Sequence, residues 1–431
     1  MLVKNCSWLL TQNVHRHILR DCSVLINDGR IVEVGDGLKT ADIVIDGAGK
    51  IALPGLINTH THLSMVLLRG YADSMRLQDW LQTVWPVEAR LTPEACYQGA
   101  LLGCAEMIMS GTTTFMDMYF NMEDVARAVN ESGLRAILSC GIIDLFDSAK
   151  AKAEQAKSRK FFEYLHTLGN SRIQFALAPH APYTCSAETL LWAKEFAEKN
   201  GVIDNIHVAE TRKEQADFQK IQGLRVVEYL DKIGALSNRL VAAHCVWLTK
   251  REVAILAKAG VGVAHCPVSN MKLASGGVAP LPEMFATGVA VGLGTDGAAS
   301  NNSLDMFETM KVCALLHKAH RWNATVLDAQ KTLDLATIEG ARVLGLQGDI
   351  GSIEVGKKAD IIMLDMHSPN LNPIHGKETV VSDLVYSASP TNVATTIVDG
   401  QLLMLNRQLI TMNPQQTVQS TEQIANQLFR P

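Results

Sequence analysis

The sequence predicts an α/β fold, a (β/α)₈ TIM-type barrel joined to a small β-sandwich that both chain ends build. Short apolar strands alternate with helical stretches eight times through the middle of the chain, which is the pattern of such a barrel. The two ends instead alternate apolar and polar residues around tight turns, as β-hairpins do. The length of 431 residues suits a large barrel plus a smaller unit.

The β-rich ends define the predicted domains. Segments 22–35 and 395–405 each carry an Asp-Gly pair between apolar runs, and this pair favours a two-residue hairpin turn. We expect residues 1–56 and 351–431 to form the two parts of the sandwich, with the metal-dependent barrel at 57–350. The alternative is two unrelated caps on the barrel.

Eight barrel strands are expected, separated by helices. Thr92, which precedes a proline, begins a helix that Gly111 ends, and Thr249 begins another that ends at Gly260. An open doubly wound sheet would show the same alternation, but a glycine-rich phosphate loop normally follows its first strand. Here His60-Thr61-His62 follows instead. The expected strands are Ile51–Ile57, Thr112–Met118, Arg135–Ser139, Ile173–Ala178, Ile203–Val208, Leu240–Ala243, Val261–Ala264 and Val289–Gly294.

The composition argues against several classes of partner. The net charge is −5 and no basic stretch occurs, so we expect no nucleic acid to bind. No apolar run approaches the ~20 residues of a membrane span, and the N-terminus does not resemble a signal peptide. Nine cysteines without paired spacing are typical of reduced thiols. We therefore expect a cytoplasmic homo-oligomer that acts on a small molecule.

Polar side chains stand at the C-terminal ends of four predicted strands, where barrel enzymes keep their active sites. One strand-end histidine alone would suit a structural role, but five polar residues on four strand ends indicate a metal site. Positions i and i+2 of an extended backbone point to the same side, so the first two histidines can reach one ion. The residues are His60, His62, His207, His244 and Asp296, with Glu210 three positions after His207.

The ligand types favour one divalent ion per subunit. Three neutral imidazoles and one carboxylate match zinc, which can keep a position open for water. Iron(II) and manganese accept the same ligands. A two-metal site would need a bridging ligand from the middle of the barrel, usually a modified lysine. The fourth strand ends at Ala178-Pro179-His180 without a lysine, which favours a single metal.

Three segments resemble the amidohydrolase superfamily and, within it, the 5′-methylthioadenosine/S-adenosylhomocysteine deaminases: PGLINTHTHLSMVLLRG (54–70), GTDGAASNNSLDMF (294–307) and GSIEVGKKADIIMLD (351–365). The last segment is similar to the family's return from barrel to sandwich, and the resemblance covers nearly the whole chain. It implies hydrolytic deamination of the adenine ring of a 5′-modified adenosine, giving the inosine analogue and ammonia. It also implies the metal ligands His60, His62, His207 and Asp296 and the acid–base pair Glu210 and His244.

The chemistry of these residues agrees with that implication. A divalent ion lowers the pKa of bound water to roughly 7 and so makes hydroxide available. Asp296 can take the proton of the water, and His244 can hold the attacking oxygen. Glu210, as a carboxylic acid, can protonate the ring nitrogen beside the attacked carbon and then the departing ammonia. Glu210 and Asp296 would thereby both touch the substrate; the alternative role for Glu210 is to orient His207.

Further residues are candidates for substrate binding. Trp85 and Glu88 lie in the long connection after the first strand, where they could line the pocket mouth. The resemblance implies that Glu88 holds the ribose hydroxyls and that His180 contacts the nucleoside. The alternatives are that Glu88 is an ordinary surface charge and that His180 is a core histidine. His265 suits a structural and a functional role equally. The histidines expected on the surface or in helices are His15, His17, His317, His320, His367 and His375.

One position departs from the family pattern. Members often carry an arginine near the end of the third strand that can meet the carboxylate of S-adenosylhomocysteine, and our alignment places Cys140 there. Either another residue takes that role or neutral 5′-substituents are preferred.

Two alternative functions stay open. Guanine or 5′-deoxyadenosine deaminases and s-triazine hydrolases share the metal residues, but a free base or a triazine has no ribose for Glu88 and His180 to hold. A non-enzymatic scaffold on the same barrel would normally lose ligand histidines, and here all four ligand positions are filled.

Overall fold

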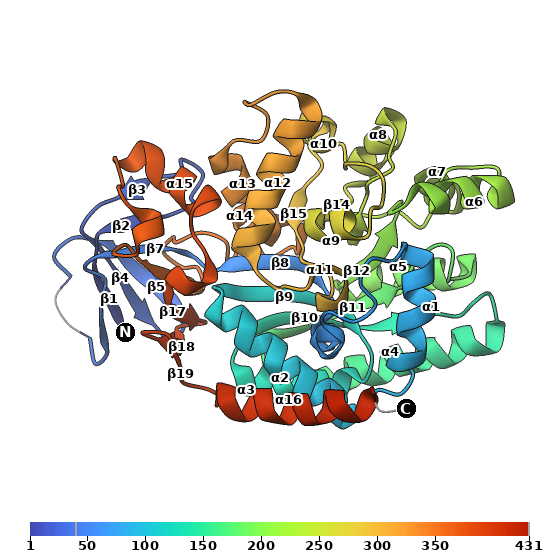
Figure 1. The fold of residues 1–431 in the computed structure, drawn as a ribbon, viewed down its shortest axis with the longest axis horizontal. Helices are drawn as coiled ribbons and strands as arrows, with labels where there is room; N and C mark the ends of the chain where they lie inside the picture. The colour runs from blue at the N-terminus through green and yellow to red at the C-terminus, as the bar shows by residue number, and fades with distance from the viewer. Residues whose placement is uncertain (39–40, 430–431) are drawn as a thin grey trace.

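The computed structural model describes residues 1–38 and 41–429 and has a barrel at one end and β-sheets at the other (Figure 1). Eight parallel strands follow one another around the barrel in sequence order. They are β8 (Leu56–Thr61), β9 (Thr112–Tyr119), β10 (Arg135–Ile142), β11 (Ile173–Pro179), β12 (Ile203–Val208), β13 (Leu240–His244), β14 (Gly262–His265) and β15 (Val291–Leu293).

The first and last strands meet to close the barrel. The Thr59 hydroxyl donates to the carbonyl of Leu293 at 2.9 Å, and the Asp296 amide donates to the carbonyl of His60 at 3.0 Å. The second of these bonds places two of the predicted site residues side by side.

The first predicted strand is wrong in one respect. Residues 51–57 do not form one strand, because β7 (Lys50–Pro54) belongs to the sandwich and β8 begins at Leu56. Gly55 lies between them, and a Cβ there would come within 2.1 Å of the Thr113 side chain. The chain therefore changes sheets at a point where only glycine has room. The other seven strands match the predicted ones to within three residues at either end.

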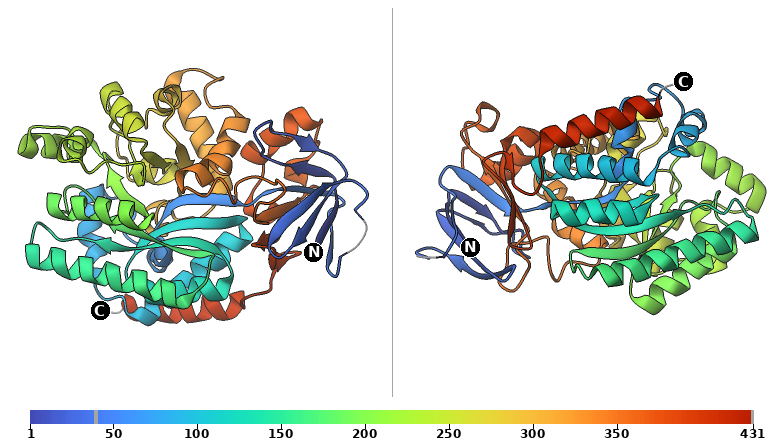
Figure 2. Two further views of the ribbon diagram at one scale, coloured as in Figure 1. Left: turned by 180° about the vertical axis from the view of Figure 1, so that it is seen from behind. Right: turned by 90° about the horizontal axis from the view of Figure 1, so that it is seen from below.

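Two sheets drawn from both chain ends pack together beside the barrel (Figure 2). Val24 and Ile31 from the N-terminal part share one core with Ile361 and Ile397 from the C-terminal part, so the ends form one sandwich and not two separate caps. The first sheet contains β1 (Leu2–Cys6), β4 (Cys22–Asn27), β5 (Arg30–Gly35) and β6 (Val44–Asp46); the second contains β2 (Trp8–Leu10), β3 (Ile18–Leu19), β7, β16 (Ile361–Asp365), β17 (Val393–Val398), β18 (Gln401–Leu405) and β19 (Gln408–Leu409).

Helices surround the barrel, and their ends carry the expected capping residues. Thr92 caps the helix that begins at Pro93, and Thr249 forms a capping box that begins the helix ending before Gly260. The helices are α1 (Leu77–Glu88), α2 (Pro93–Met109), α3 (Met122–Ser132), α4 (Ser148–Leu168), α5 (Ala187–Asn200), α6 (Arg212–Gln222), α7 (Val226–Ile233), α8 (Lys250–Ala259), α9 (Pro267–Lys272), α10 (Leu281–Thr287), α11 (Ala298–Asn301), α12 (Met306–Arg321), α13 (Ala329–Leu335), α14 (Ile338–Val343), α15 (Lys377–Tyr386) and α16 (Pro414–Leu428), with short 3₁₀ turns at Leu63–Leu68, Pro369–Leu371 and Pro390–Asn392.

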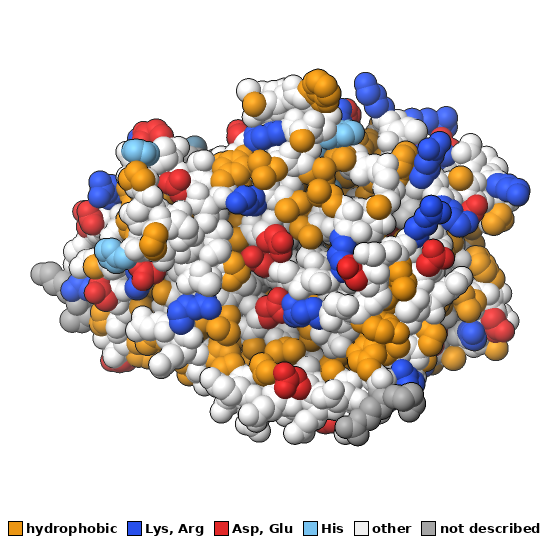
Figure 3. Space-filling view, viewed as in Figure 1, with side chains coloured by type: hydrophobic (Ala, Val, Ile, Leu, Met, Phe, Trp, Pro, Cys, Tyr) orange, Lys and Arg blue, Asp and Glu red, His pale blue; other side chains and the backbone are white. Residues whose placement is uncertain are grey.

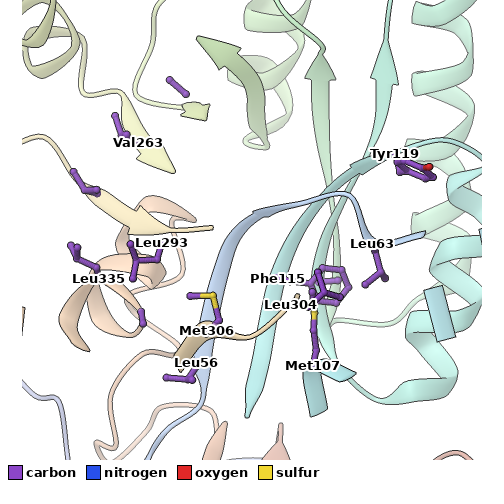
Figure 4. Packing of buried hydrophobic residues seen from close by; sticks show 14 of the residues in the cluster. Leu56, Leu63, Met107, Phe115, Tyr119, Val263, Leu293, Leu304, Met306 and Leu335 are labelled. Carbon is purple, nitrogen blue, oxygen red and sulfur yellow. The ribbon is translucent and has the colours of Figure 1, made fainter. Parts of the chain in front are cut away.

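The core holds the strands in place from both sides. Leu63, Met107 and Phe115, from three different elements, pack against the outside of the barrel (Figure 4). Inside, small and branched residues such as Ile57 and Ile137 pack against the segment around 341–350, which fills the N-terminal end. The opposite, C-terminal end is thereby left for the site.

The C-terminal segment continues past the sandwich. After β19 the chain runs back along the barrel, and α16 lies beside α2 (Figure 1), with Leu428 packed near Ala95. The domain limits at residues 56 and 350 stay a prediction. Over residues 1–38 and 41–429, no helix combines the length and apolar character that crossing a membrane requires.

Candidate active site

Four predicted metal ligands converge at the C-terminal end of the barrel. One ligand atom from each of His60, His62, His207 and Asp296 lies within 4.8 Å of every other. Nε2 of His62 is 3.1 Å and Nε2 of His60 is 3.6 Å from Oδ1 of Asp296. Because these residues come from β8 and the residue after it, from β12 and from the segment after β15, only the closed barrel brings them together.

Neighbouring groups orient the ligand atoms toward one another. Nδ1 of His62 lies 2.6 Å from the carbonyl of Met118, and Nδ1 of His207 lies 2.8 Å from the carbonyl of His180. A carbonyl can only accept, so each Nδ1 carries a proton, and in the neutral ring the lone pair is then on Nε2. Both ring nitrogens of His60 are buried and have no hydrogen-bond partner among the described residues.

Two serines hold the far oxygen of Asp296. Ser269 Oγ donates to Oδ2 at 2.6 Å and Ser300 Oγ donates to it at 2.8 Å. Oδ1 is therefore the oxygen that faces the histidines. Burial alone would raise the pKa of Asp296, but the adjacent His60 and His62 side chains hold it well below its usual range. Three imidazole nitrogens and an ionised carboxylate oxygen, packed this closely, fit a divalent metal ion.

Glu210 and His244 stand beside the four ligands. Oε2 of Glu210 is 3.9 Å from Nε2 of His244, and Nδ1 of His244 is 2.9 Å from the side-chain amide of Asn270. Burial, reinforced by the charge of Asp296, raises the pKa of Glu210 to about 8. Glu210 is therefore protonated at neutral pH, as a general acid must be.

The backbone is strained where these groups leave their strands. Ala209, His244 and Asp296 have φ values of 53°, 72° and 61°, in the left-handed region that costs a residue other than glycine of order 1–3 kcal/mol. Glu214 stabilises the turn around Glu210 by accepting from its backbone amide at 2.7 Å. Strain of this kind persists only where surrounding contacts hold it, and it clusters at functional sites.

A pocket opens directly over this group. Trp85, Glu88 and His180, the predicted substrate contacts, all line it, as do three of the four predicted metal ligands, His62, His207 and Asp296. Glu88 is half-buried and accepts a hydrogen bond from the Tyr119 hydroxyl at 2.8 Å, so it is not an ordinary surface charge. Burial raises its pKa, and the bond from Tyr119 opposes that rise. Its role in holding ribose stays a prediction.

The remaining histidines differ in position. His180 lines the pocket, and Nδ1 of its ring is 2.9 Å from the Thr184 hydroxyl. His265, at the end of β14, lies outside the lining; its Nε2 is 3.3 Å from Nε2 of His317 on α12. This buried hydrogen bond ties the helix to the strand and favours the structural role for His265. His317 was expected in a helix or on the surface, and it is in a helix but fully buried.

Cys140 does not lie in the pocket, where the alignment with the family places it. Cys140 packs against the outer apolar core, on the face of β10 turned away from the pocket, and Gly141 lines the pocket instead. Neighbouring residues of a strand point to opposite faces, so an alignment shifted by one residue reverses the face. Among the described residues that line the pocket there are three carboxylates and no lysine or arginine.

The chain matches the amidohydrolase family over residues 51–403. It belongs to this family. It is 49% identical over 413 residues, 95% of each chain, to a 5′-deoxyadenosine deaminase of Methanothermobacter thermautotrophicus. It is also 49% identical over 384 residues, 89% of each chain, to a 5-methylthioadenosine/S-adenosylhomocysteine deaminase of Thermococcus sibiricus.

Solved structures agree with the fold of this amidohydrolase. An adenosine deaminase from Xanthomonas campestris, crystallised with bound zinc, superposes with a TM-score of 0.92 at 36% identity, over 99% of this chain and 98% of the other. The family membership and these similarities identify the chain as an enzyme. They also confirm the predicted barrel and the predicted similarity of this chain to deaminases of adenine nucleosides.

Proposed function

We propose that this amidohydrolase removes the amino group from the adenine ring of 5′-modified adenosines, giving the inosine analogue and ammonia. The observation that carries the proposal is the convergence of His60, His62, His207 and Asp296. The last three of these line a pocket together with Glu210 and Glu88. The names of the relatives, 5′-deoxyadenosine and 5-methylthioadenosine/S-adenosylhomocysteine deaminases, point to the same substrate class.

The ligand set supports one divalent ion per chain, with zinc preferred. His60, His62, His207 and Asp296 would hold it, and a bound ion supplies hydroxide at neutral pH by lowering the pKa of water to roughly 7. A two-metal site usually takes its bridging ligand from a modified lysine. The residue that follows β11 is His180 and not a lysine, which supports a single ion over a pair.

The residues around the ion divide the proton transfers. Asp296 Oδ1 receives a proton from water, since Oδ2 is already bonded to Ser269 and Ser300. Glu210, protonated at neutral pH, gives its proton to N1 of adenine as oxygen adds to C6. His244 Nε2 donates to that oxygen. The proton on Asp296 then passes to the amino group, the C6–N bond breaks and ammonia leaves. The hydrogen of the added hydroxyl returns to the Glu210 carboxylate, which leaves the C6 carbonyl of the inosine analogue and restores the protonated acid.

The substrate is a nucleoside and not a nucleic acid polymer. Glu88 at the pocket mouth suits a vicinal diol, because a carboxylate can accept two hydrogen bonds. On the face seen in Figure 3, basic and acidic side chains are interspersed, which is unlike the basic stripe that binds phosphates. The position of Glu88 and His180 favours nucleosides over guanine and s-triazines.

A substrate panel tests the proposed function. The zinc-loaded enzyme is supplied with 5′-deoxyadenosine, 5′-methylthioadenosine, S-adenosylhomocysteine, adenosine, guanine and a chlorotriazine, and ammonia or chloride release is followed. We expect the highest kcat/KM with a 5′-modified adenosine. A higher value with guanine or the triazine would overturn the proposal.

Glu88 is expected to contribute to ribose binding. Glu88→Ala should weaken the binding of adenosine-type substrates by roughly 1–3 kcal/mol, because the ribose hydroxyls lose their acceptor. The substitution should lower kcat/KM less for a 2′-deoxy substrate than for the matching ribonucleoside, since the 2′-deoxy substrate already lacks half of the interaction. Equal losses of kcat/KM on both substrates would place Glu88 outside the ribose site.

The 5′-group preference follows from the charges in the pocket. Among the described residues that line the pocket, no lysine or arginine is present to pair with a carboxylate, so 5′-methylthioadenosine should have a higher kcat/KM than S-adenosylhomocysteine. A Cβ at Gly141 would lie 3.6 Å from the Phe120 ring, an ordinary contact, so Gly141→Arg can place a guanidinium in the pocket. In that variant the two kcat/KM values should lie closer together, because arginine pairs bidentately with the carboxylate of S-adenosylhomocysteine. A parent enzyme that prefers S-adenosylhomocysteine would refute this reading.

A further inference from the structure

Tyr119 links Glu88 to the wall of the barrel. It is the last residue of β9, is 2% exposed, and donates its hydroxyl to Oε1 of Glu88 at 2.8 Å. Glu88 is the last residue of α1, a helix that lies outside the barrel sheet. Tyr119 stands further along β9 than Phe115, with its hydroxyl oxygen visible at the end of the ring (Figure 4).

Within the described part of the chain, this is the only hydrogen bond from a side chain of α1 to the barrel. The others stay within the segment: Thr83 donates to the carbonyl of Asp79 and to the sulfur of Met75. Apolar contacts through Leu77, Trp80, Val84 and Val87 hold the helix down, but apolar contacts do not orient a carboxylate. The orientation of Glu88 therefore depends on Tyr119.

The geometry leaves suitable acceptors for a diol. A carboxylate offers about four lone-pair positions, and Tyr119 occupies one of them on Oε1. Among the described residues, no other side chain or backbone group bonds to this carboxylate. Glu88 lines the same pocket as His62, His207 and Asp296. Two adjacent hydroxyls need two acceptors at a set spacing and angle, which a freely rotating carboxylate would not present.

We propose that Tyr119 is a positioning residue that orients the Glu88 carboxylate toward the 2′- and 3′-hydroxyls of ribose, and so makes the enzyme selective for ribonucleosides over their deoxy forms. The inference rests on the proposed function. Tyr119 does not touch the reacting atoms; it acts through Glu88, on substrate binding and not on the bond-breaking step.

Tyr119→Phe tests this, because it removes the hydroxyl and keeps the packed ring. With 5′-deoxyadenosine, kcat/KM should fall about 10-fold, mainly through KM, as expected for the loss of a hydrogen bond to a charged group. With 2′,5′-dideoxyadenosine the fall should be smaller. In a Glu88→Ala background, Tyr119→Phe should cause no further loss, because its partner is already absent.

Tyr97→Phe is the matched control. The Tyr97 hydroxyl donates to Glu131 at 2.7 Å between α2 and α3, so this variant also removes one tyrosine–glutamate bond but should keep parental kinetics. Thermal unfolding followed by circular dichroism checks that Tyr119→Phe stays folded.

Equal losses of kcat/KM on the two nucleosides, or additive losses with Glu88→Ala, would overturn the positioning role. If the parent turns over neither nucleoside, the proposed function fails and this inference fails with it; if the parent does and Tyr119→Phe matches it, only the inference fails.

Discussion

Replacing Asp296 or His207 by alanine is expected to abolish turnover and to lower the metal content of the purified protein. Each variant removes one of four ligand atoms that lie within 4.8 Å of one another, and the three that remain hold an ion less tightly. Asp296→Ala also removes the group that accepts the proton of the attacking water. The barrel should stay folded, since both residues lie at its C-terminal end and not in the packed interior.

Metal analysis, ammonia release and circular dichroism measured on the same samples check this prediction. His320→Ala is a suitable control, because His320 is an exposed histidine on α12 away from the site, and it should keep parental metal content and rate. A His207→Ala protein that retains both full metal and full activity would show that the four residues do not form the metal site.

Glu210→Gln is expected to keep the metal and to lose most of the rate. Glutamine has nearly the same shape but cannot deliver a proton to the adenine ring, so kcat should fall on the order of 10²-fold or more. Burial raises the pKa of Glu210 to about 8, which keeps the proton on this residue at neutral pH. KM should change little, because the side chain still fills its place.

The competing role for Glu210 makes a different prediction. If Glu210 only oriented His207, Glu210→Gln would lower metal content together with activity. The structure already gives His207 another orienting partner, the carbonyl of His180 at 2.8 Å from Nδ1, whereas Glu210 approaches His244. Metal content and kcat measured together separate the two roles.

The barrel and the convergence of His60, His62, His207 and Asp296 could be predicted because their signals are local. Each strand shows as an apolar run, and each functional side chain comes directly after one, as His60 and His62 do. A closed parallel barrel brings all strand ends to the same rim. The meeting of His207 with Asp296, 89 positions along the chain, therefore follows from the fold class without knowledge of any distance.

The residues that orient the site could not be predicted in the same way. Ser269, Ser300 and Asn270 lie in short helices or their ends and act on partners from other elements, so no sequence spacing marks them. Tyr119 had one available signal, its place at the end of a strand, but tyrosine is common in strands for packing alone. The partners become visible only once the chain is folded.

Two errors have a common origin in strand register. Residues 51–57 read as one apolar run, yet Gly55 divides it between two sheets because the Thr113 side chain leaves no room for a Cβ. Cys140 was placed in the pocket, yet its neighbour Gly141 faces the substrate side. In both cases a displacement of one or two residues changes the face or the sheet, and local composition does not specify it.

The most direct test of the account is a metal titration of activity. Protein stripped of metal is supplied with increasing zinc, and bound zinc and the rate of 5′-deoxyadenosine deamination are measured at each step. We expect no activity in the stripped protein and a rate that rises in proportion to bound zinc, reaching its maximum at one ion per chain. Full activity without metal, or a rate that begins to rise only after a first ion is bound, would contradict the single-metal hydrolytic mechanism.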